Sequence, residues 1–142
     1  IHAALGISQL KKIGKYIKNR NSIAKFYKKI LKNLPIKMQK INTKYISSYH
    51  LFVIKMTNLN NIKNYDKIFN FLRKKNILVN LHYLPVHKQP YYRKMKYLKN
   101  KSFKVSEEYS KSALSLPIYP GLNEKNITYI FKNFKFALKK FR

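Results

Sequence analysis

The side chains best suited to chemistry are concentrated in one segment, Asn80–Tyr92, with the sequence NLHYLPVHKQPYY. It contains two of the four histidines, His82 and His87, together with three tyrosines. Imidazole and phenol groups can donate, accept or transfer protons and can pack against a ligand. Pro85 and Pro90 lack a backbone N–H and push the preceding residues towards extended backbone. We therefore predict an irregular, rigid loop at the end of a strand, where binding sites are often found.

Several catalytic arrangements are excluded by spacing. His82 and His87 lie five residues apart, but no HExxH pair or neighbouring carboxylate accompanies them, so we expect no metal site. Glu107 and Glu108 are adjacent, and a helix would direct them to different faces. The sequence has no GxSxG elbow and no glycine-rich phosphate loop. The chain therefore carries no complete catalytic set.

The other histidines and tyrosines are interpreted as structural. We expect His50, within a predicted strand, to be a hydrogen-bonded structural histidine, and Tyr91 and Tyr92 to be packing residues. Two interpretations stay open for His82, Tyr83 and His87. Each side chain either bonds its own backbone or contacts a ligand.

A long helical segment is predicted over residues 1–34, because apolar residues recur there at steps of three, four or seven. Polar residues at 19–22 interrupt the pattern, so the segment is either two helices or one bent helix, and Pro35 ends it. Gly6 and Gly14 weaken a helix, so we expect another backbone to approach them.

Strands and helices alternate after this segment. Runs of aromatic and β-branched residues predict three strands, at 49–56, 77–81 and 114–118. Helical spacing predicts helices at 62–75, 105–113 and 123–141, with Asn76 as a left-handed cap and Asn123 as an N-cap. The predicted fold is a single α/β or α+β domain, residues 1–142, in which the helical segment 1–34 leads into a three-stranded part, 36–142, covered by helices.

Composition narrows the possible partners. The 45% hydrophobic content supports a packed core, cysteine is absent, and no apolar run is long enough for a membrane helix, so we expect a soluble, cytoplasmic protein. A net charge of +28 is typical of nucleic-acid binding. However, all but four of the 32 basic residues are lysines, spread along the chain with many Asn, Ile, Tyr and Phe residues, and these types share A- and T-rich codons. We therefore prefer compositional drift as the explanation of the high charge. A nucleic-acid-binding module stays as the alternative.

Four stretches, IHAALGISQLKK, SSYHLFVIKM, NLHYLPVHKQPYY and SALSLPIYPGLNE, resemble the C-terminal part of the DegT/DnrJ/EryC1/StrS family in order and spacing. These are pyridoxal-phosphate-dependent sugar aminotransferases. The chain looks most similar to members that aminate a UDP-linked 4-keto-6-deoxy sugar on the way to pseudaminic acid. The resemblance implies the small C-terminal domain of a fold type I homodimer, with glutamate as amino donor and a nucleotide sugar as substrate.

The resemblance also divides the functional residues between two domains. It implies that the cofactor lysine lies in a large N-terminal domain upstream of Ile1, so we expect this chain alone to bind no pyridoxal phosphate and to be inactive. Within the chain it implies substrate-binding roles for His82, Tyr83, Pro85 and His87. We expect the first helix to pack on the absent domain. A non-catalytic remnant of such an enzyme is a further alternative.

Overall fold

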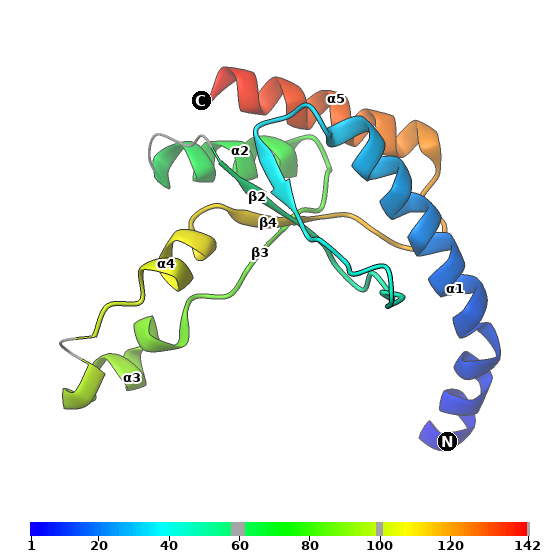
Figure 1. Cartoon of the computed structure of the whole chain (residues 1–142), viewed down its shortest axis with the longest axis horizontal. Helices are drawn as coiled ribbons and strands as arrows, with labels where there is room; N and C mark the ends of the chain where they lie inside the picture. The colour runs from blue at the N-terminus through cyan, green and yellow to red at the C-terminus, as the bar shows by residue number, and fades with distance from the viewer. Residues whose placement is uncertain (58–61, 99–100, 142) are drawn as a thin grey trace.

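The computed structural model describes residues 1–57, 62–98 and 101–141 (Figure 1). Helices alternate with short strands, which confirms the predicted class of helices combined with a small sheet. The elements are α1 His2–Leu31, β1 Ile36–Met38, β2 Phe52–Met56, α2 Ile62–Lys74, β3 Asn80–Leu81, α3 Pro90–Arg93, α4 Lys104–Ser110, β4 Ala113–Leu116 and α5 Glu124–Lys140, with 3₁₀ turns η1 Val86–Lys88 and η2 Lys96–Leu98.

The sheet has four strands in the order β1-β2-β4-β3, and all neighbouring pairs are antiparallel. The prediction of three strands was therefore wrong, because it missed β1, which pairs with β2. The predicted strand at 49–56 begins only at Phe52, and the one at 77–81 is paired only over Asn80–Leu81. Strands β2 and β4 lie at the centre, with Ile54 opposite Leu114.

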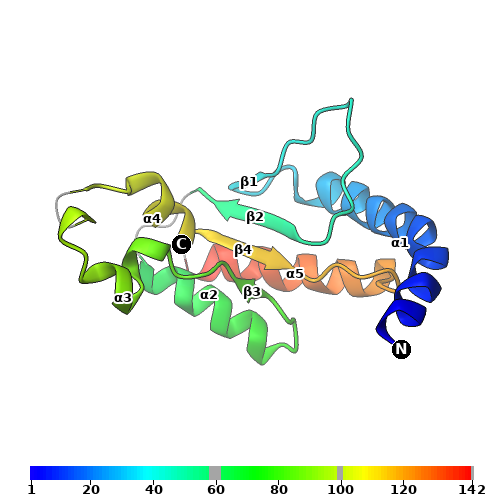
Figure 2. The ribbon, with the colours of Figure 1, turned by 90° about the horizontal axis from the view of Figure 1, so that it is seen from below.

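The two faces of the sheet have different surroundings. Helices α2 and α5 cover one face (Figure 1), and the strands lie in front of these helices when seen from below (Figure 2). Along β2, burial alternates as expected for such a sheet: Phe52, Ile54 and Met56 are buried, whereas Val53 and Lys55 are only half-buried. We call the side that carries Val53 and Lys55 the open face.

Two buried tyrosines attach helices to the ends of β4. The ring of Tyr27 on α1 stacks on Phe52 at 4.9 Å, and its hydroxyl donates to the Pro117 carbonyl at 2.9 Å. Tyr65 on α2 donates to the Ala113 carbonyl at 2.6 Å. Burial raises the pKa of Tyr65 to about 12, with a smaller contribution from Asp66, and raises that of Tyr27 as well. Both hydroxyls therefore stay protonated donors.

Helix α1 is continuous and curves along its length (Figure 1). The polar residues near its middle do not break it, because their side chains bond other segments. Asn19 donates to the Pro120 carbonyl at 3.3 Å, and Asn21 donates to the Ser47 carbonyl at 2.9 Å. The sequence thus offered two alternatives, and the single curved helix is the one observed.

Only the second half of α1 belongs to the core. Ile23, Ala24, Tyr27 and Leu31 are buried, whereas Leu5, Ile7, Leu10 and Ile13 are each about half exposed or more. We call these last four residues the α1 stripe. Apart from the neighbouring residues and the backbone of α1 itself, no atom of the described chain comes within 4 Å of a Cβ built at Gly6 or Gly14, so no other backbone of this chain makes the predicted close approach.

The predicted helix caps are confirmed. Asn76 follows α2 with a φ of 55°, in the left-handed region that asparagine tolerates. The Asn123 side chain accepts a hydrogen bond from the Asn126 backbone N–H at 2.9 Å at the start of α5.

As for membranes, the helices of the described part are all too short or too polar to cross a bilayer.

Candidate functional site

The predicted site loop is the first part of an arm that extends from the sheet (Figure 1). We define the arm as residues 82–98 and 101–110, which include η1, α3, η2 and α4. The prediction that its prolines prevent regular structure was wrong. Pro90 occupies the first turn of α3, where its missing N–H costs nothing, and Pro85 directly precedes η1. None of these four short elements contributes a buried side chain.

His82 lies where the arm leaves the sheet. Its Nε2 is 3.2 Å from the Ser115 hydroxyl on β4, and its ring contacts Tyr109 of α4 edge-on, with centroids 5.6 Å apart. Because Ser115 pairs with Val53, these contacts place His82 on the open face. Partial burial lowers the pKa of His82, so the imidazole is neutral at neutral pH and can act as a hydrogen-bonding group.

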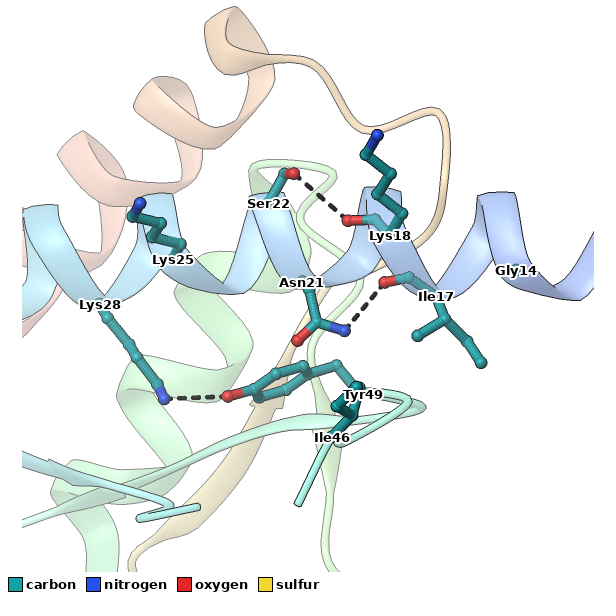
Figure 3. Close-up of a pocket in the computed structure, with 9 residues that line it drawn as sticks. All are labelled: Gly14, Ile17, Lys18, Asn21, Ser22, Lys25, Lys28, Ile46 and Tyr49. Carbon is teal, nitrogen blue, oxygen red and sulfur yellow. Dashed lines mark hydrogen bonds between the residues drawn. The ribbon is translucent and has the colours of Figure 1, made fainter. Parts of the chain in front are cut away.

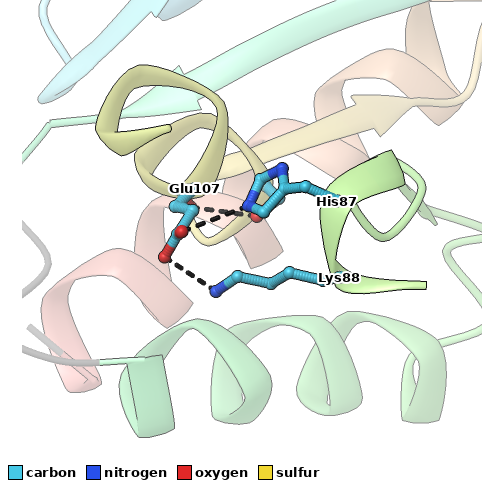
Figure 4. A network of polar contacts seen from close by, with 4 residues as sticks. His87, Lys88 and Glu107 are labelled. Carbon is cyan, nitrogen blue, oxygen red and sulfur yellow. Dashed lines mark hydrogen bonds and ion pairs between the residues drawn. The ribbon is translucent and has the colours of Figure 1, made fainter. Parts of the chain in front are cut away.

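His87 is held by a carboxylate from α4 (Figure 4). Its Nε2 lies 3.1 Å from Glu107 Oε1, the Lys88 ammonium lies 2.7 Å from Glu107 Oε2, and the imidazole stacks on Phe103 at 4.4 Å. Hydrogen bonds from Lys88 and then from His87 hold the pKa of Glu107 below its usual value. We call Glu107, His87 and Lys88 the Glu107 clamp, because it joins η1 to α4.

The four predicted site residues therefore have different surroundings. Tyr83 is 94% exposed, His82 is half-buried on the open face, Pro85 is buried, and His87 is engaged by the clamp. Both histidines contact α4, although through different side chains. Contact of these four residues with a substrate stays a prediction. Glu107 could not be recognised from the sequence as the partner of His87, because the two residues are 20 positions apart.

The expectation for His50 was wrong, whereas Tyr91 and Tyr92 pack against each other. His50 precedes β2 instead of lying within it, and it is exposed, so it is not an internal histidine of the strand. Tyr91 and Tyr92 do not pack into the core. They contact each other edge-on, with ring centroids 5.3 Å apart, and Tyr91 is 71% exposed.

One observation bears on the predicted absence of a pyridoxal phosphate site from this chain. A lysine that forms a Schiff base is typically desolvated, whereas no lysine whose side-chain burial the structure describes is buried. Likewise, no three His, Asp or Glu side chains among residues 1–57, 62–98 and 101–141 come together as metal ligands. The absence of cofactor and metal from the chain on its own stays a prediction.

A hollow of about 660 Å³ lies between α1 and the segment that precedes β2 (Figure 3). Lys18, Lys25 and Lys28 all contribute to its lining, but they do not converge. Lys28 donates to the Tyr49 hydroxyl at 2.9 Å, whereas Lys18 and Lys25 extend from the opposite side of the helix (Figure 3). This hollow contains none of the predicted site residues.

Comparison with known proteins identifies the family. Residues 1–135 match the model of the DegT/DnrJ/EryC1/StrS aminotransferase family. The chain belongs to this family. One relative, the dTDP-4-amino-4,6-dideoxy-D-glucose transaminase of Escherichia coli, is 32% identical over 136 residues, which are 93% of this chain and 36% of the relative. The chain spans about a third of the length of the curated relatives it matches.

Solved structures of similar proteins agree with the family match. PseC of Helicobacter pylori, an aminotransferase of pseudaminic acid biosynthesis, is 28% identical and superposes with a TM-score of 0.85 over 96% of this chain and 36% of its own. The pyridoxal-phosphate form of the sugar aminotransferase Spr1654 of Streptococcus pneumoniae is 22% identical and shares the fold, with a TM-score of 0.86 over 99% of this chain and 36% of its own. The DegT-family fold predicted from the sequence is therefore confirmed.

Proposed function

We propose that this chain is the C-terminal small domain of a pyridoxal-phosphate-dependent aminotransferase. The enzyme transfers an amino group from glutamate to a nucleotide-linked keto-deoxy sugar in the biosynthesis of a bacterial cell-surface glycan. The family match over residues 1–135 carries this proposal. The substrate is proposed to be a UDP-linked 4-keto-6-deoxy sugar, and the similarity to PseC supports the coarser assignment to an aminotransferase of pseudaminic acid type. We further propose that the enzyme is a cytoplasmic homodimer.

The cofactor lysine is proposed to belong to a domain outside this chain, which makes the isolated chain inactive. Two observations support this division. No lysine whose side-chain burial is described is buried, and the α1 stripe exposes apolar side chains that a second domain would cover. We propose that the α1 stripe packs on that domain. The chain itself then acts by binding and orienting the sugar nucleotide.

Within the loop we propose a division of tasks. Tyr83 and His82 contact the sugar nucleotide, because Tyr83 offers a free ring and hydroxyl and His82 offers a neutral imidazole at the edge of the open face. Pro85 and His87 hold the loop, because the first is buried and the second is bonded to Glu107. Such fixed geometry lowers the entropic cost of placing the substrate.

Steady-state kinetics of the full-length gene product that contains this chain tests the proposal. Tyr83→Ala and His82→Ala are each expected to raise the KM for the sugar nucleotide about tenfold, because each removes a contact of about 1.4 kcal/mol. Tyr97→Ala is the matched control, since Tyr97 is also an exposed tyrosine of the arm. No transamination of any nucleotide keto sugar by the parent enzyme refutes the function, and unchanged kinetics in both site variants refutes the residue assignment.

A further inference from the structure

The open face of the sheet carries two lysines directly opposite each other. Lys37 of β1 and Lys55 of β2 are register partners, so their side chains leave the sheet on the same side. Both line a hollow of about 430 Å³. The other residues that line it are Met38, Gln39, Val53 and Tyr109.

This arrangement is electrostatically unfavourable without a ligand. Like charges at directly opposed positions destabilise a strand pair, and β1 is only three residues long, with Lys37 at its centre. Among the described residues, no carboxylate lies within ion-pair distance of either lysine, and the ion pairs of Glu107 go to His87 and Lys88. An anion between the two ammonium groups would replace their repulsion with two attractions.

The hollow adjoins the predicted site loop. Tyr109 lines it and also contacts the ring of His82 edge-on. Val53, another lining residue, pairs with Ser115, whose hydroxyl contacts His82. Tyr109 therefore connects the hollow that contains the lysine pair to His82. The hollow along α1 differs, because its lysines point to opposite sides of the helix (Figure 3).

We propose that Lys37 and Lys55 bind the diphosphate of the sugar nucleotide on the open face, with the Tyr109 hydroxyl available as a further donor. The identity of the ligand rests on the proposed function, whereas the anion site rests on the register and the hollow alone. The lysines act as point charges that hold the diphosphate, so that the sugar can reach the His82 and Tyr83 end of the site.

Inorganic pyrophosphate and UDP are the probes, titrated against this chain at physiological salt and followed by NMR. The double variant K37Q/K55Q is compared with K125Q/K139Q, which removes the same charge from two exposed lysines of α5. We expect K37Q/K55Q to weaken pyrophosphate and UDP binding at least about tenfold, because two charge-assisted contacts are lost. K125Q/K139Q is expected to change the affinity less than about twofold, as general screening predicts. Circular dichroism checks the fold, and the single variants K37Q and K55Q replace the double variant if it unfolds.

Several results would overturn the inference. Equal weakening in both double variants means that the +28 charge attracts anions diffusely. Absence of pyrophosphate binding to the parent chain removes the site outright. Selective loss of single-stranded oligonucleotide binding in K37Q/K55Q, with pyrophosphate binding unchanged, assigns the surface to nucleic acid instead. Because the pyrophosphate titration needs no catalysis, it tests the anion site independently of the aminotransferase activity.

Discussion

The sheet with its covering helices and the arm differ in what fixes their side chains. In the core, apolar residues of α1, α2 and α5 are buried against β2 and β4, as Ile54, Leu72 and Phe134 illustrate. In the arm, the short helices bury no side chain, and the Glu107 clamp and the stacking of His87 on Phe103 hold the segments together. Apolar burial contributes most of the folding free energy, whereas partly exposed ion pairs contribute little.

This difference indicates that the arm can loosen while the core stays folded. Segments with little buried apolar surface open locally at low free energy, and ligand-binding loops are commonly drawn from such segments. The residues proposed to contact the substrate therefore lie on the less stable part of the molecule. Three substitutions and one change of pH test this difference.

The largest effect on the free energy of unfolding is expected from Phe134→Ala. Phe134 is fully buried in α5, so its truncation should lower the free energy of unfolding by about 3–5 kcal/mol through lost burial and the cavity left behind. Urea denaturation measures the change. Phe136→Ala is the control on the same helix, because Phe136 is 52% exposed and should cost much less. Similar losses for both variants would contradict the assigned core.

A smaller effect is expected from Tyr27→Phe, which removes only the hydroxyl that donates to the Pro117 carbonyl. The variant should lose about 1–2 kcal/mol of stability, because it leaves a partly buried acceptor without its partner. Tyr129→Phe is the matched control, since that hydroxyl donates to the Lys75 carbonyl at an exposed position. Thermal unfolding compares the two. If Tyr129→Phe lowered stability as much as Tyr27→Phe, burial would not determine how much such a hydrogen bond stabilises the fold.

The smallest effect on global stability is expected from Glu107→Gln, although the arm itself should change clearly. Loss of the carboxylate charge weakens the contacts to His87 and Lys88, so amide hydrogen exchange should accelerate at 86–98 while the core amides keep their rates. Glu108→Gln, the exposed neighbour, is the control. Unchanged exchange in the arm would show that the clamp does not order it.

Acidification tests the same clamp without mutation. The pKa of Glu107 is lowered in the folded chain, so the stabilisation from its charge is fully present above the ordinary value of 4.5. It is lost as the pH falls through the lowered value. Arm exchange corrected for the intrinsic pH dependence should therefore rise in that range in the parent, and the rise should be absent from Glu107→Gln.

Local sequence patterns predicted the elements that local forces decide. The helical spacing of α2 and α5 and the two asparagine caps were recognisable, because capping and periodicity act within a few residues. Strand β1 was missed because three residues after Pro35 carry almost no pattern, and pairing with β2 defines them. The exposed half of α1 was expected only from the family resemblance, since periodicity identifies an apolar face but not whether this chain covers it.

The candidate site could be predicted only in part, because some of its contacts are local in sequence and others are not. The concentration of His, Tyr and Pro residues marked residues 80–92, but it did not reveal that Pro90 begins a helix. It also could not identify Glu107 as the partner of His87, or Ser115 as the partner of His82, because those contacts span 20 and 33 residues. Long-range contacts of single polar side chains have no periodic pattern in the sequence.

The α1 stripe has a consequence for the behaviour of this chain in concentrated solution. At low ionic strength, a net charge of +28 makes the molecules repel one another and keeps their apolar stripes apart. The Debye length shortens from about 10 Å at 0.1 M salt to about 3 Å at 1 M, so added salt removes this repulsion but leaves the hydrophobic attraction intact. Salt that releases bound polyanions from the protein therefore also promotes its self-association, and low-salt buffers favour the monomer during purification.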